Sequence, residues 1–306
     1  MENKDVAIIG LGPAGVSASI YLKRYGMNPI CFEKELVGGK VNKTEMIENY
    51  AGVLKISGPK LGMTYEDQLS SFGIKPIYKE IKELSLNDDG TFHLKWFKEE
   101  KDFKYVILSN GLKNRPFPIA GEESFHRRGI SECAICDGAL YKGKDVAIIG
   151  AGNSAFEEAS YLATICSSVT LIARRKEFRA TSSAVNRFLS FSNTKILAPY
   201  DVVEAFGTNS IEKLKVKNKE TGEIEELSIS GLFLYVGEIP ENSFIKISSL
   251  DTNNGFIKTD DKMMTNISNL YAVGDCKDKT LRQVVTATSD GAIAASAIHE
   301  NYLNNI

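Results

Sequence analysis

Short runs of β-branched and other apolar residues recur along the chain, and several lead through glycine into a helix-length stretch. Residues 6–10 read VAIIG, and residues 146–150 repeat the same letters. Each copy continues through a glycine-rich turn and a helix-length segment into a second apolar run. The order strand, turn, helix, strand builds parallel sheets with right-handed crossovers. We therefore predict an α/β fold in which one nucleotide-binding unit occurs twice.

Both turns have the spacing that binds phosphate. The pattern is G-x-G-x-x-G in the first turn and G-x-G-x-x-A in the second, at Gly10, Gly12, Gly15, Gly150, Gly152 and Ala155. Small residues there permit a tight turn, let backbone amides approach a pyrophosphate and let the helix pack closely on the strand. The helix N-terminus adds oriented N–H groups and a partial positive charge. Two Rossmann-like domains explain this duplication better than two ordinary glycine-rich turns do.

The residues that end the second strand of each copy distinguish two ligands. Glu33 ends that strand in the first copy, where a carboxylate can accept both ribose hydroxyls of an adenine nucleotide. Ala173 has this position in the second copy, and Arg174, Arg175 and Arg179 follow it. Guanidinium groups chelate a 2′-phosphate that a carboxylate would repel. The first site therefore suits FAD or NAD and the second suits NADP, with a solvated basic cluster as the alternative for the arginines.

The C-terminal part of the sequence supplies a second arm for the first site. Residues 270–275, LYAVGD, form a short apolar run that ends in Gly274-Asp275, and a long helix rich in small residues is expected over residues 281–303. Such a strand end suits the ribityl and phosphate groups of a flavin, so FAD is favoured over NAD. The pattern also predicts a split FAD-binding domain with an NADP-binding-like domain inserted in it, the former being residues 1–113 and 241–306 and the latter residues 114–240.

Two further stretches alternate like antiparallel strands. Residues 91–97 and 103–109, separated by a charged turn, predict a hairpin with Trp96 on a half-exposed sheet, and residues 211–236 predict a similar hairpin. Prolines near the two domain crossings are the expected hinge borders, namely Pro116, Pro118 and Pro240.

A pair of cysteines lies just before the second VAIIG. Cys133 and Cys136 are spaced to close a small disulfide ring, and a helix that starts there would lower the pKa of a thiol. We favour a redox-active pair over a zinc site or a passive disulfide, because the chain has no second C-x-x-C and only three histidines. Asp137 follows, where a carboxyl can protonate a departing thiolate; helix capping is its alternative role. Cys31 and Cys166 fall in apolar runs and are predicted core residues.

Composition limits the class of protein. The 306 residues include 37 basic and 39 acidic ones, for a formal net charge of −2, which argues against nucleic acid or anionic lipid as a partner. No run approaches the ~18 uncharged apolar residues of a membrane helix, and the first residues do not have the pattern of a signal peptide. Five cysteines do not suit a secreted disulfide framework. We therefore expect a cytoplasmic protein with no membrane segment.

In this order the motifs resemble those of the low-molecular-weight bacterial thioredoxin reductases. The resemblance covers nearly the whole chain and rests on GLGPAG at 10–15, GG at 38–39, ENY at 48–50, CAICDG at 133–138, GAGNSAFEEA at 150–159, RRKEFRA at 174–180, GD at 274–275 and RQ at 282–283. It implies a flavoprotein with two dinucleotide-binding domains, one inserted in the other, that forms homodimers and reduces thioredoxin.

The resemblance also implies roles for individual residues. Cys136 would be the thiol that faces the flavin, Cys133 the one that attacks thioredoxin, and Asp137 the general acid. The residues that would hold FAD are Gly10, Gly12, Ala14, Gly15, Glu33, Gly39, Lys40, Asn49, Gly274, Asp275, Arg282 and Gln283. Those that would hold NADPH are Gly152, Asn153, Ser154, Ala155, Arg174, Arg175 and Arg179.

Some positions depart from the family pattern. Lys40 replaces the usual glutamine near the flavin, and Ala173 replaces the usual histidine before the arginines. A related group of this fold takes electrons from ferredoxin and has eroded nicotinamide sites, so these departures keep ferredoxin open as the donor in place of NADPH. A ferredoxin–NADP reductase would have no reason to retain the C-x-x-C. No sequence feature favours a non-enzymatic flavin redox sensor.

Overall fold

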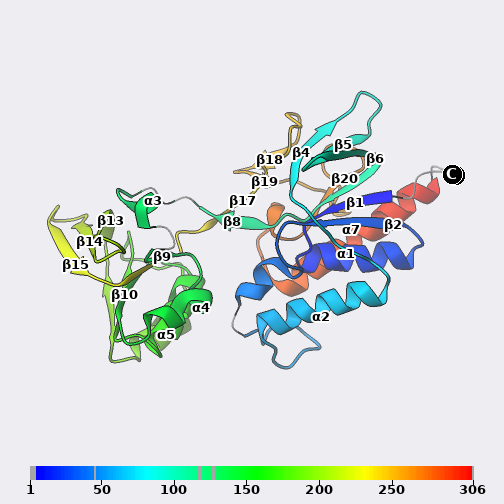
Figure 1. Ribbon diagram of the computed structural model, residues 1–306. Coiled ribbons are helices and arrows are strands. Elements are labelled where there is room, and N and C mark those ends of the chain that lie inside the picture. Colours follow the sequence, from blue (N-terminus) through cyan, green and yellow to red (C-terminus); the bar gives the residue numbers. More distant parts are fainter. Residues whose placement is uncertain (1–4, 45, 116, 118, 126–127, 305–306) are drawn as a thin grey trace. The chain divides into compact units, whose positions relative to one another are not determined.

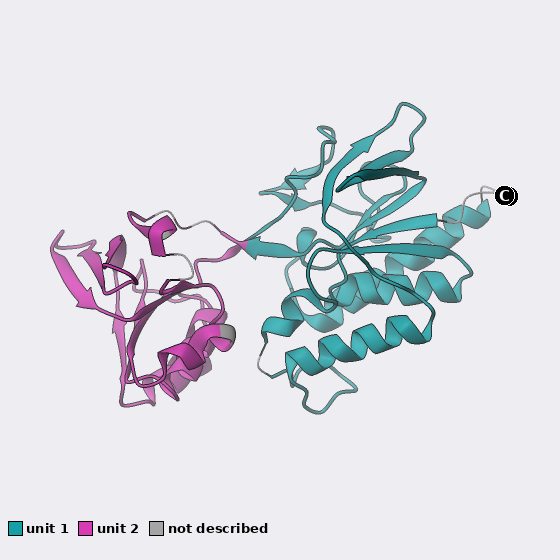
Figure 2. Cartoon of the chain, in the orientation of Figure 1, with its two compact units in different colours: residues 1–113, 239–306 teal, residues 114–238 magenta. Residues whose placement is uncertain are grey.

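The computed structural model describes residues 5–44, 46–115, 117, 119–125 and 128–304, with the side chains of residues 122 and 136 excepted. The chain forms two compact units (Figure 2): unit 1 comprises residues 1–113 and 239–306, and unit 2 comprises residues 114–238. The connections between them contain the strands β8 (Leu112–Asn114) and β17 (Glu238–Pro240), which pair with each other. Pro240 ends β17, whereas Pro116 and Pro118 lie outside the described residues.

Unit 1 is built on a five-stranded parallel sheet (Figure 1). Its strand order is β20-β7-β1-β2-β3, with bounds β1 (Asp5–Ile9), β2 (Asn28–Glu33), β3 (Ile77–Tyr78), β7 (Tyr105–Leu108) and β20 (Leu270–Ala272). One face is covered by helices, namely α1 (Pro13–Arg24), α2 (Gly58–Ser71) and α7 (Val284–Asn304). The other face is covered by an antiparallel sheet of β4 (Ile81–Leu86), β5 (Phe92–Trp96) and β6 (Glu99–Phe103).

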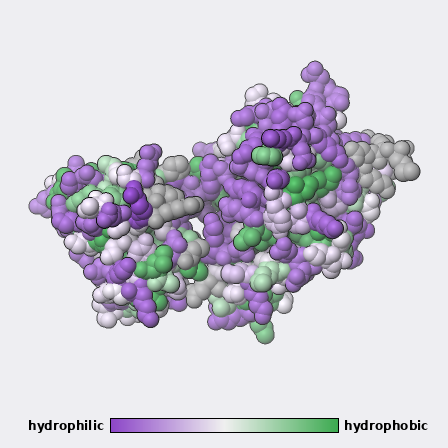
Figure 3. Space-filling view, in the orientation of Figure 1, coloured by the Kyte–Doolittle hydropathy of each residue, from purple (hydrophilic) through white to green (hydrophobic). Residues whose placement is uncertain are grey.

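Alternation along the central strands explains these two faces. In β1, Val6 and Ile8 join the core under the helices, while Ala7 and Ile9 join the core under the antiparallel sheet. Successive strand side chains point to opposite faces, so a strand buried on both sides is apolar throughout. The outer strand β6 carries Glu99 to Asp102 into solvent, and the surface over this sheet is mainly hydrophilic (Figure 3).

The expected first hairpin is partly wrong. Strand β5 does form a hairpin, and Trp96 is buried on it, 4.8 Å between ring centroids from Phe32. Its partner, however, is β6 in the segment interpreted as a charged turn, and β7 lies in the parallel sheet beside β1. Four consecutive apolar residues suit a strand that is covered on both faces better than an antiparallel strand with one wet face.

Unit 2 repeats the arrangement. Its parallel sheet has the order β12-β11-β10-β16-β9, with bounds β9 (Ile130–Ser131), β10 (Asp145–Ile149), β11 (Ser168–Ile172), β12 (Thr194–Leu197) and β16 (Gly231–Leu234). The helices are α3 (Glu122–Phe125), α4 (Ala134–Asp137), α5 (Asn153–Ala163) and α6 (Ser182–Leu189). The predicted second hairpin is confirmed by β14 (Lys213–Asn218) and β15 (Ile224–Ser228), which β13 (Tyr200–Phe206) extends.

Remaining short elements lie next to the site residues. They are the 3₁₀ turns η1 (Gly39–Lys43), η2 (Gly138–Tyr141) and η3 (Gly274–Cys276) and the small ribbon of β18 (Thr252–Asn253) and β19 (Phe256–Ile257). No helix in the described part of the chain is long and apolar enough to cross a membrane.

Candidate active site

The first glycine-rich turn joins β1 to α1, and its three glycines meet different constraints. Gly10 has a φ of +99°, and a Cβ there would lie 2.5 Å from the Ser109 carbonyl oxygen. A Cβ on Gly15 would lie 2.0 Å from the Gly10 carbonyl oxygen. At Gly12 the nearest atom is 4.0 Å away. The fold itself thus requires glycine at the first and third positions, whereas Gly12 faces space that a ligand can occupy.

Glu33 ends β2 directly beside this turn. Its side chain is buried, and its Oε2 accepts the Leu11 N–H at 2.7 Å while Oε1 accepts the Glu35 N–H at 2.9 Å. A carboxylate has about four acceptor positions, so both oxygens retain capacity for ribose hydroxyls. The backbone thereby fixes the orientation of the carboxylate next to the turn.

The C-terminal arm reaches the same turn through small residues. Gly274 has a φ of +72°, and a Cβ there would lie 2.9 Å from the Cβ of Ala14. Gly291 on α7 packs against the same helix α1, since a Cβ on Gly291 would meet the Ala14 carbonyl oxygen at 2.1 Å. These contacts bring the predicted residues of the N-terminal and C-terminal segments together.

Asp275 follows in this arm and has a buried oxygen without a partner. Its Oδ1 is buried and has no hydrogen bond within the described residues, while its backbone carbonyl accepts the Arg282 Nε–H at 3.3 Å. Burial raises the pKa of Asp275, and the positive charges of Lys279, Lys40 and Arg282 oppose that shift. A buried acceptor of this kind suits a hydroxyl-bearing ligand.

Several predicted flavin-site residues surround Asp275. Arg282 lies over the Phe256 ring, 4.1 Å from its centroid, and Asn49 donates to the Gln283 Oε1 at 3.0 Å. Burial of its ammonium group lowers the pKa of Lys40, although much of its side chain is exposed, and the charge of Asp275 opposes the shift. Gly39 has a φ of +54° and approaches Gly12, with 3.5 Å between a Gly39 Cβ and the Gly12 Cα.

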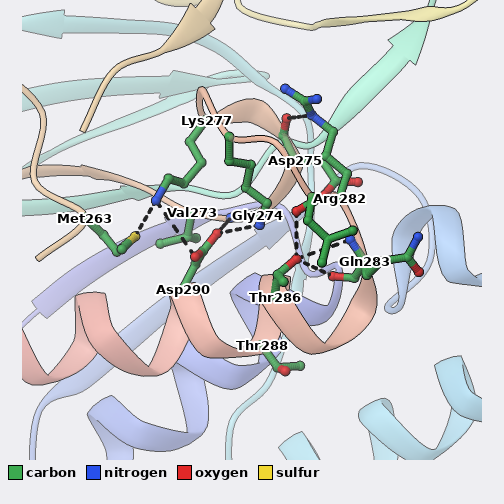
Figure 4. A network of polar contacts seen from close by, with 12 residues as sticks. Met263, Val273, Gly274, Asp275, Lys277, Arg282, Gln283, Thr286, Thr288 and Asp290 are labelled. Carbon is green, nitrogen blue, oxygen red and sulfur yellow. Dashed lines mark hydrogen bonds and ion pairs between the residues drawn. The ribbon is translucent and has the colours of Figure 1, made fainter. Parts of the chain in front are cut away.

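The polar network that supports this arm includes residues that sequence reasoning missed (Figure 4). The Asp290 carboxylate on α7 accepts the Gly274 N–H at 3.0 Å and the Lys279 ammonium at 2.7 Å. Lys277 lies 3.8 Å from the other Asp290 oxygen and donates to the Met263 sulfur at 2.8 Å. Asp290 stands in an alanine-rich helix, where a lone acid gives no spacing signal.

The second glycine-rich turn, between β10 and α5, shows the same division of constraints. A Cβ on Gly150 would lie 2.5 Å from the Ala155 Cβ and 2.7 Å from the Tyr235 carbonyl oxygen, whereas Gly152 has no atom within 4 Å. Asn153 accepts the Thr181 N–H at 2.8 Å through Oδ1, and Ser154 is exposed in the first turn of α5. The open glycine again marks the place for a ligand backbone contact.

The three predicted arginines differ in their partners. Arg174 donates from Nε to the Asp201 Oδ1 at 2.8 Å. Arg175 and Arg179 are exposed and form no side-chain ion pair with the described residues. The backbone N–H of Arg179 donates to the Ala151 carbonyl at 2.8 Å, so this loop is tied to the glycine-rich turn. Two guanidinium groups near the turn are therefore available to an anion.

Cys133 stands immediately before the single-turn helix α4 and is disulfide-bonded. The side chain of Cys136 lies outside the described part of the structure. Asp137 accepts a hydrogen bond from the Ser131 hydroxyl, with 2.6 Å between Ser131 Oγ and Asp137 Oδ2, and makes no side-chain cap bond to η2. Helix capping is therefore not its contact here.

The other cysteines occupy the core. Cys31, Cys166 and Cys276 are free and buried, which confirms the core prediction for the first two. Burial raises the pKa of the Cys31 and Cys276 thiols to about 12 and that of Cys166 to about 11. Thiols in such surroundings are poor nucleophiles. Within the described residues, no three His, Cys, Asp or Glu side chains gather as metal ligands.

Comparison with known proteins identifies the family. The family model described as pyridine nucleotide-disulphide oxidoreductase matches residues 4–291. The chain belongs to this family. A thioredoxin reductase of Ureaplasma parvum serovar 3 is 40% identical, with 99% of this chain and 98% of that protein covered.

Solved structures of pyridine nucleotide-disulphide oxidoreductase relatives have the same architecture. The crystal structure of Lactococcus lactis thioredoxin reductase (FR conformation) matches with a TM-score of 0.93 at 35% identity and covers 99% of both chains. A ferredoxin-flavin thioredoxin reductase from Clostridium acetobutylicum matches with a TM-score of 0.54 at 31% identity and covers 98% of each. The resemblance and the predicted two-dinucleotide-binding fold class are thereby confirmed.

Within this family fold, hydroxyl groups near Cys133 are a second set of residues that sequence reasoning missed. The Cys133 N–H donates to the Ser131 Oγ at 3.1 Å, and the Ala134 N–H donates to the Tyr235 hydroxyl oxygen at 3.0 Å. Burial raises the pKa of the Tyr235 hydroxyl, and the negative charge of Glu158 adds to the shift. Tyr235 lies 101 residues after Ala134, so no local motif connects them.

Proposed function

We propose that this protein is an FAD-dependent thioredoxin reductase that uses NADPH as its electron donor and a Cys133–Cys136 disulfide as its redox centre. The observation that carries this proposal is that Cys133, four residues before Asp137, is disulfide-bonded. The chain that contains it belongs to the pyridine nucleotide-disulphide oxidoreductases. The thioredoxin reductases among its relatives support thioredoxin as the substrate.

The first turn and the C-terminal arm fit FAD. Gly12 leaves room for a pyrophosphate, Glu33 is oriented for ribose hydroxyls, and the orphaned Oδ1 of Asp275 suits a ribityl hydroxyl. We assign FAD binding to the residues predicted from the sequence, Gly10, Gly12, Ala14, Gly15, Glu33, Gly39, Lys40, Asn49, Gly274, Asp275, Arg282 and Gln283.

The second turn fits NADPH. Gly152 leaves room for the pyrophosphate, and Arg175 and Arg179 offer guanidinium groups to a 2′-phosphate. We assign NADPH binding to Gly152, Asn153, Ser154, Ala155, Arg174, Arg175 and Arg179, with Arg174 shared between the nucleotide and Asp201.

The chemistry of the dithiol follows from its thiols and its neighbour. Bound FAD supplies two-electron transfer from NADPH to the disulfide. The Cys133 thiolate then attacks one sulfur of the thioredoxin disulfide, and Asp137 gives its proton to the sulfur that leaves. The Cys136 thiolate displaces the reduced thioredoxin and restores the Cys133–Cys136 disulfide. The sum is NADPH, a proton and thioredoxin disulfide converted to NADP⁺ and thioredoxin dithiol.

Steady-state turnover tests the proposal. The purified holoprotein is assayed with thioredoxin as acceptor and with either NADPH or reduced ferredoxin as donor, and Cys133→Ser is the control. We expect NADPH-driven reduction of thioredoxin that the serine variant lacks. If reduced ferredoxin supports turnover and NADPH does not, the electron donor is ferredoxin and the NADPH part of the proposal is wrong. Absence of turnover with both donors would contradict the proposed function.

Thioredoxin or a thioredoxin-like protein is the proposed partner, and we also propose a cytoplasmic homodimer. NADPH-dependent reduction of protein disulfides is chemistry of the reducing compartment, which supports the location. Resemblance to the dimeric family supports the assembly, which a light-scattering mass of twice the 33.7 kDa subunit would establish.

A further inference from the structure

Two hydroxyl groups hold the turn that contains the redox cysteine. Strands β9 and β16 are parallel neighbours, with Ser131 paired to Phe233, and Ser131 and Tyr235 stand at or just after their carboxyl ends. The hydroxyl oxygens accept the N–H groups of Cys133 and Ala134 at 3.1 Å and 3.0 Å. Amides at a helix start have no partner within the helix, so these hydroxyls fix the turn to the sheet.

The Ser131 proton has two acceptors within reach, and an oxygen of the Asp137 carboxyl is the closer one. Ser131 Oγ lies 2.6 Å from Asp137 Oδ2 and 3.3 Å from the Cys133 carbonyl oxygen. The shorter separation lies within the usual range of an O–H···O hydrogen bond and the longer one lies outside it, so the hydroxyl donates to Asp137. Ser131 is 7% exposed, so little solvent reaches its side chain, whereas Asp137 is half-buried.

The contact makes the two oxygens of Asp137 unequal. Oδ2 is occupied by Ser131, whereas Oδ1 accepts no hydrogen bond from the residues that the structure describes. We propose that Ser131 is a positioning residue for the reductase reaction: it orients the Asp137 carboxyl so that Oδ1 carries the proton delivered to the departing thiolate. This inference rests on the proposed function and extends it to a residue outside the dithiol.

The step balances without any proton from Ser131. A sulfur–sulfur bond forms between Cys133 and thioredoxin, the thioredoxin disulfide breaks, and the departing thiolate takes the proton from Asp137 Oδ1. The Ser131 hydroxyl donates to Oδ2 before and after the transfer. Its contribution to the transfer is the orientation of the carboxyl, and a misplacement of such a group by about 1 Å can cost about 100-fold in rate.

Matched substitutions test this inference in the holoenzyme. Ser131→Thr keeps the hydroxyl, and Ser131→Val has nearly the same shape without it. We expect the valine variant to lose about 10- to 100-fold in kcat with thioredoxin, with KM changed less than about threefold, and the threonine variant to stay within about threefold of wild type. Anaerobic bleaching of the flavin by NADPH is measured in parallel and should be unchanged in both.

A double-mutant cycle separates action through Asp137 from a general structural effect. In an Asp137→Asn background, Ser131→Val should lower kcat less than about threefold, because asparagine has no carboxyl proton for Ser131 to position. Ser131→Ala replaces the valine variant if that one fails to bind FAD. Equal losses for threonine and valine, or full additivity with Asp137→Asn, would overturn the inference. Wild-type enzyme inactive toward thioredoxin would instead overturn the proposed function.

Discussion

A single carboxylate, that of Asp275, shows how a residue can be placed for a ligand at a cost to the folded chain. Its Oδ1 is buried without a hydrogen bond to the described residues, and burial raises the pKa of Asp275 above the ordinary 3.8. An unsatisfied buried acceptor costs about 1–3 kcal/mol until a donor fills the place. The proposed ribityl hydroxyl would be that donor.

This residue gives a prediction with opposite effects on stability and binding. Asp275→Asn should stabilise the FAD-free protein by about 1 kcal/mol at pH 7, because it removes a buried charge. FAD affinity should fall about 10- to 100-fold, the contribution of a hydrogen bond to a charged group. Thermal unfolding of the FAD-free protein and quenching of FAD fluorescence measure the two effects. Loss of stability together with unchanged FAD affinity would refute this role.

The pH dependence has a defined sign. Below the ordinary pKa of 3.8, Asp275 is protonated in both the folded and the unfolded chain, so wild type and Asp275→Asn should unfold alike. As the pH rises through the raised pKa of the folded state, the unfolded chain releases its proton first and the wild type loses stability. The advantage of the asparagine variant should therefore grow over this window, as denaturant unfolding at several pH values can show.

Residue-scale prediction from sequence had a clear limit. Gly12, Glu33 and Asp275 were predicted as ligand-binding residues because each lies at or shortly after the end of a strand. Tyr235 and Asp290 were not, since their partners lie 101 and 16 residues away in other elements and no spacing rule connects them. Ser131 was also missed, although Cys133 and Asp137 lie only 2 and 6 residues after it, because a serine close to a cysteine pair is not a specific signal. The contacts of Tyr235 and Asp290 exist only in the folded chain, where separate elements meet.

At the scale of elements, the first glycine-rich turn has one glycine that the fold requires, Gly15, and one that we assign to ligand binding, Gly12. Gly15→Ala would place a Cβ 2.0 Å from a backbone oxygen, so we expect a loss of about 2–3 kcal/mol in stability. Gly12→Ala meets nothing closer than 4.0 Å and should change stability by less than about 0.5 kcal/mol, while FAD affinity falls at least about tenfold. Urea unfolding and FAD titration of the two variants check this; equal losses of stability would disprove the division.

The arginine loop gives a graded prediction. Arg175→Ala and Arg179→Ala should each raise the KM for NADPH about tenfold or more and leave the KM for NADH nearly unchanged, because only the former nucleotide carries the 2′-phosphate. Arg174→Ala serves as the comparison and should raise it less, about threefold, since Arg174 already donates to Asp201. An equal increase in the KM for NADPH in all three variants would show that the ion pair with Asp201 does not weaken the contact of Arg174 with the nucleotide.

The strands show why one element was misplaced from sequence. The segment 99–102 is fully charged, which predicts a turn, yet it forms exposed β6 because its partner β5 supplies a buried face and solvent accepts the other. The YVIL run of β7 alternates poorly because it is buried on both sides. The local pattern of apolar and polar residues shows which face of a strand is buried and which is exposed. It does not show which other strand will pair with it.

For the whole molecule, the repeated VAIIG was the strongest indication of two nucleotide-binding domains. Its two copies form β1 and β10, and equivalent bonds recur: the Gly10 N–H donates to Phe32 O at 2.8 Å, and the Gly150 N–H donates to Ile172 O at 3.1 Å. A repeat of this length fixes both topology and ligand class, because the turn, the helix and the strand end act together. No repeat in the sequence indicates the substrate. Thioredoxin was inferred from the resemblance of the motifs to a known family.

Counting electrons tests the central claim, that NADPH reduces a bound flavin and the Cys133–Cys136 disulfide in one protein. Anaerobic titration with NADPH should show that the wild-type holoprotein takes up about two equivalents per subunit, one for the flavin and one for the disulfide. The variant with both cysteines replaced by serine should take up about one. Equal uptake by the two proteins would contradict the account.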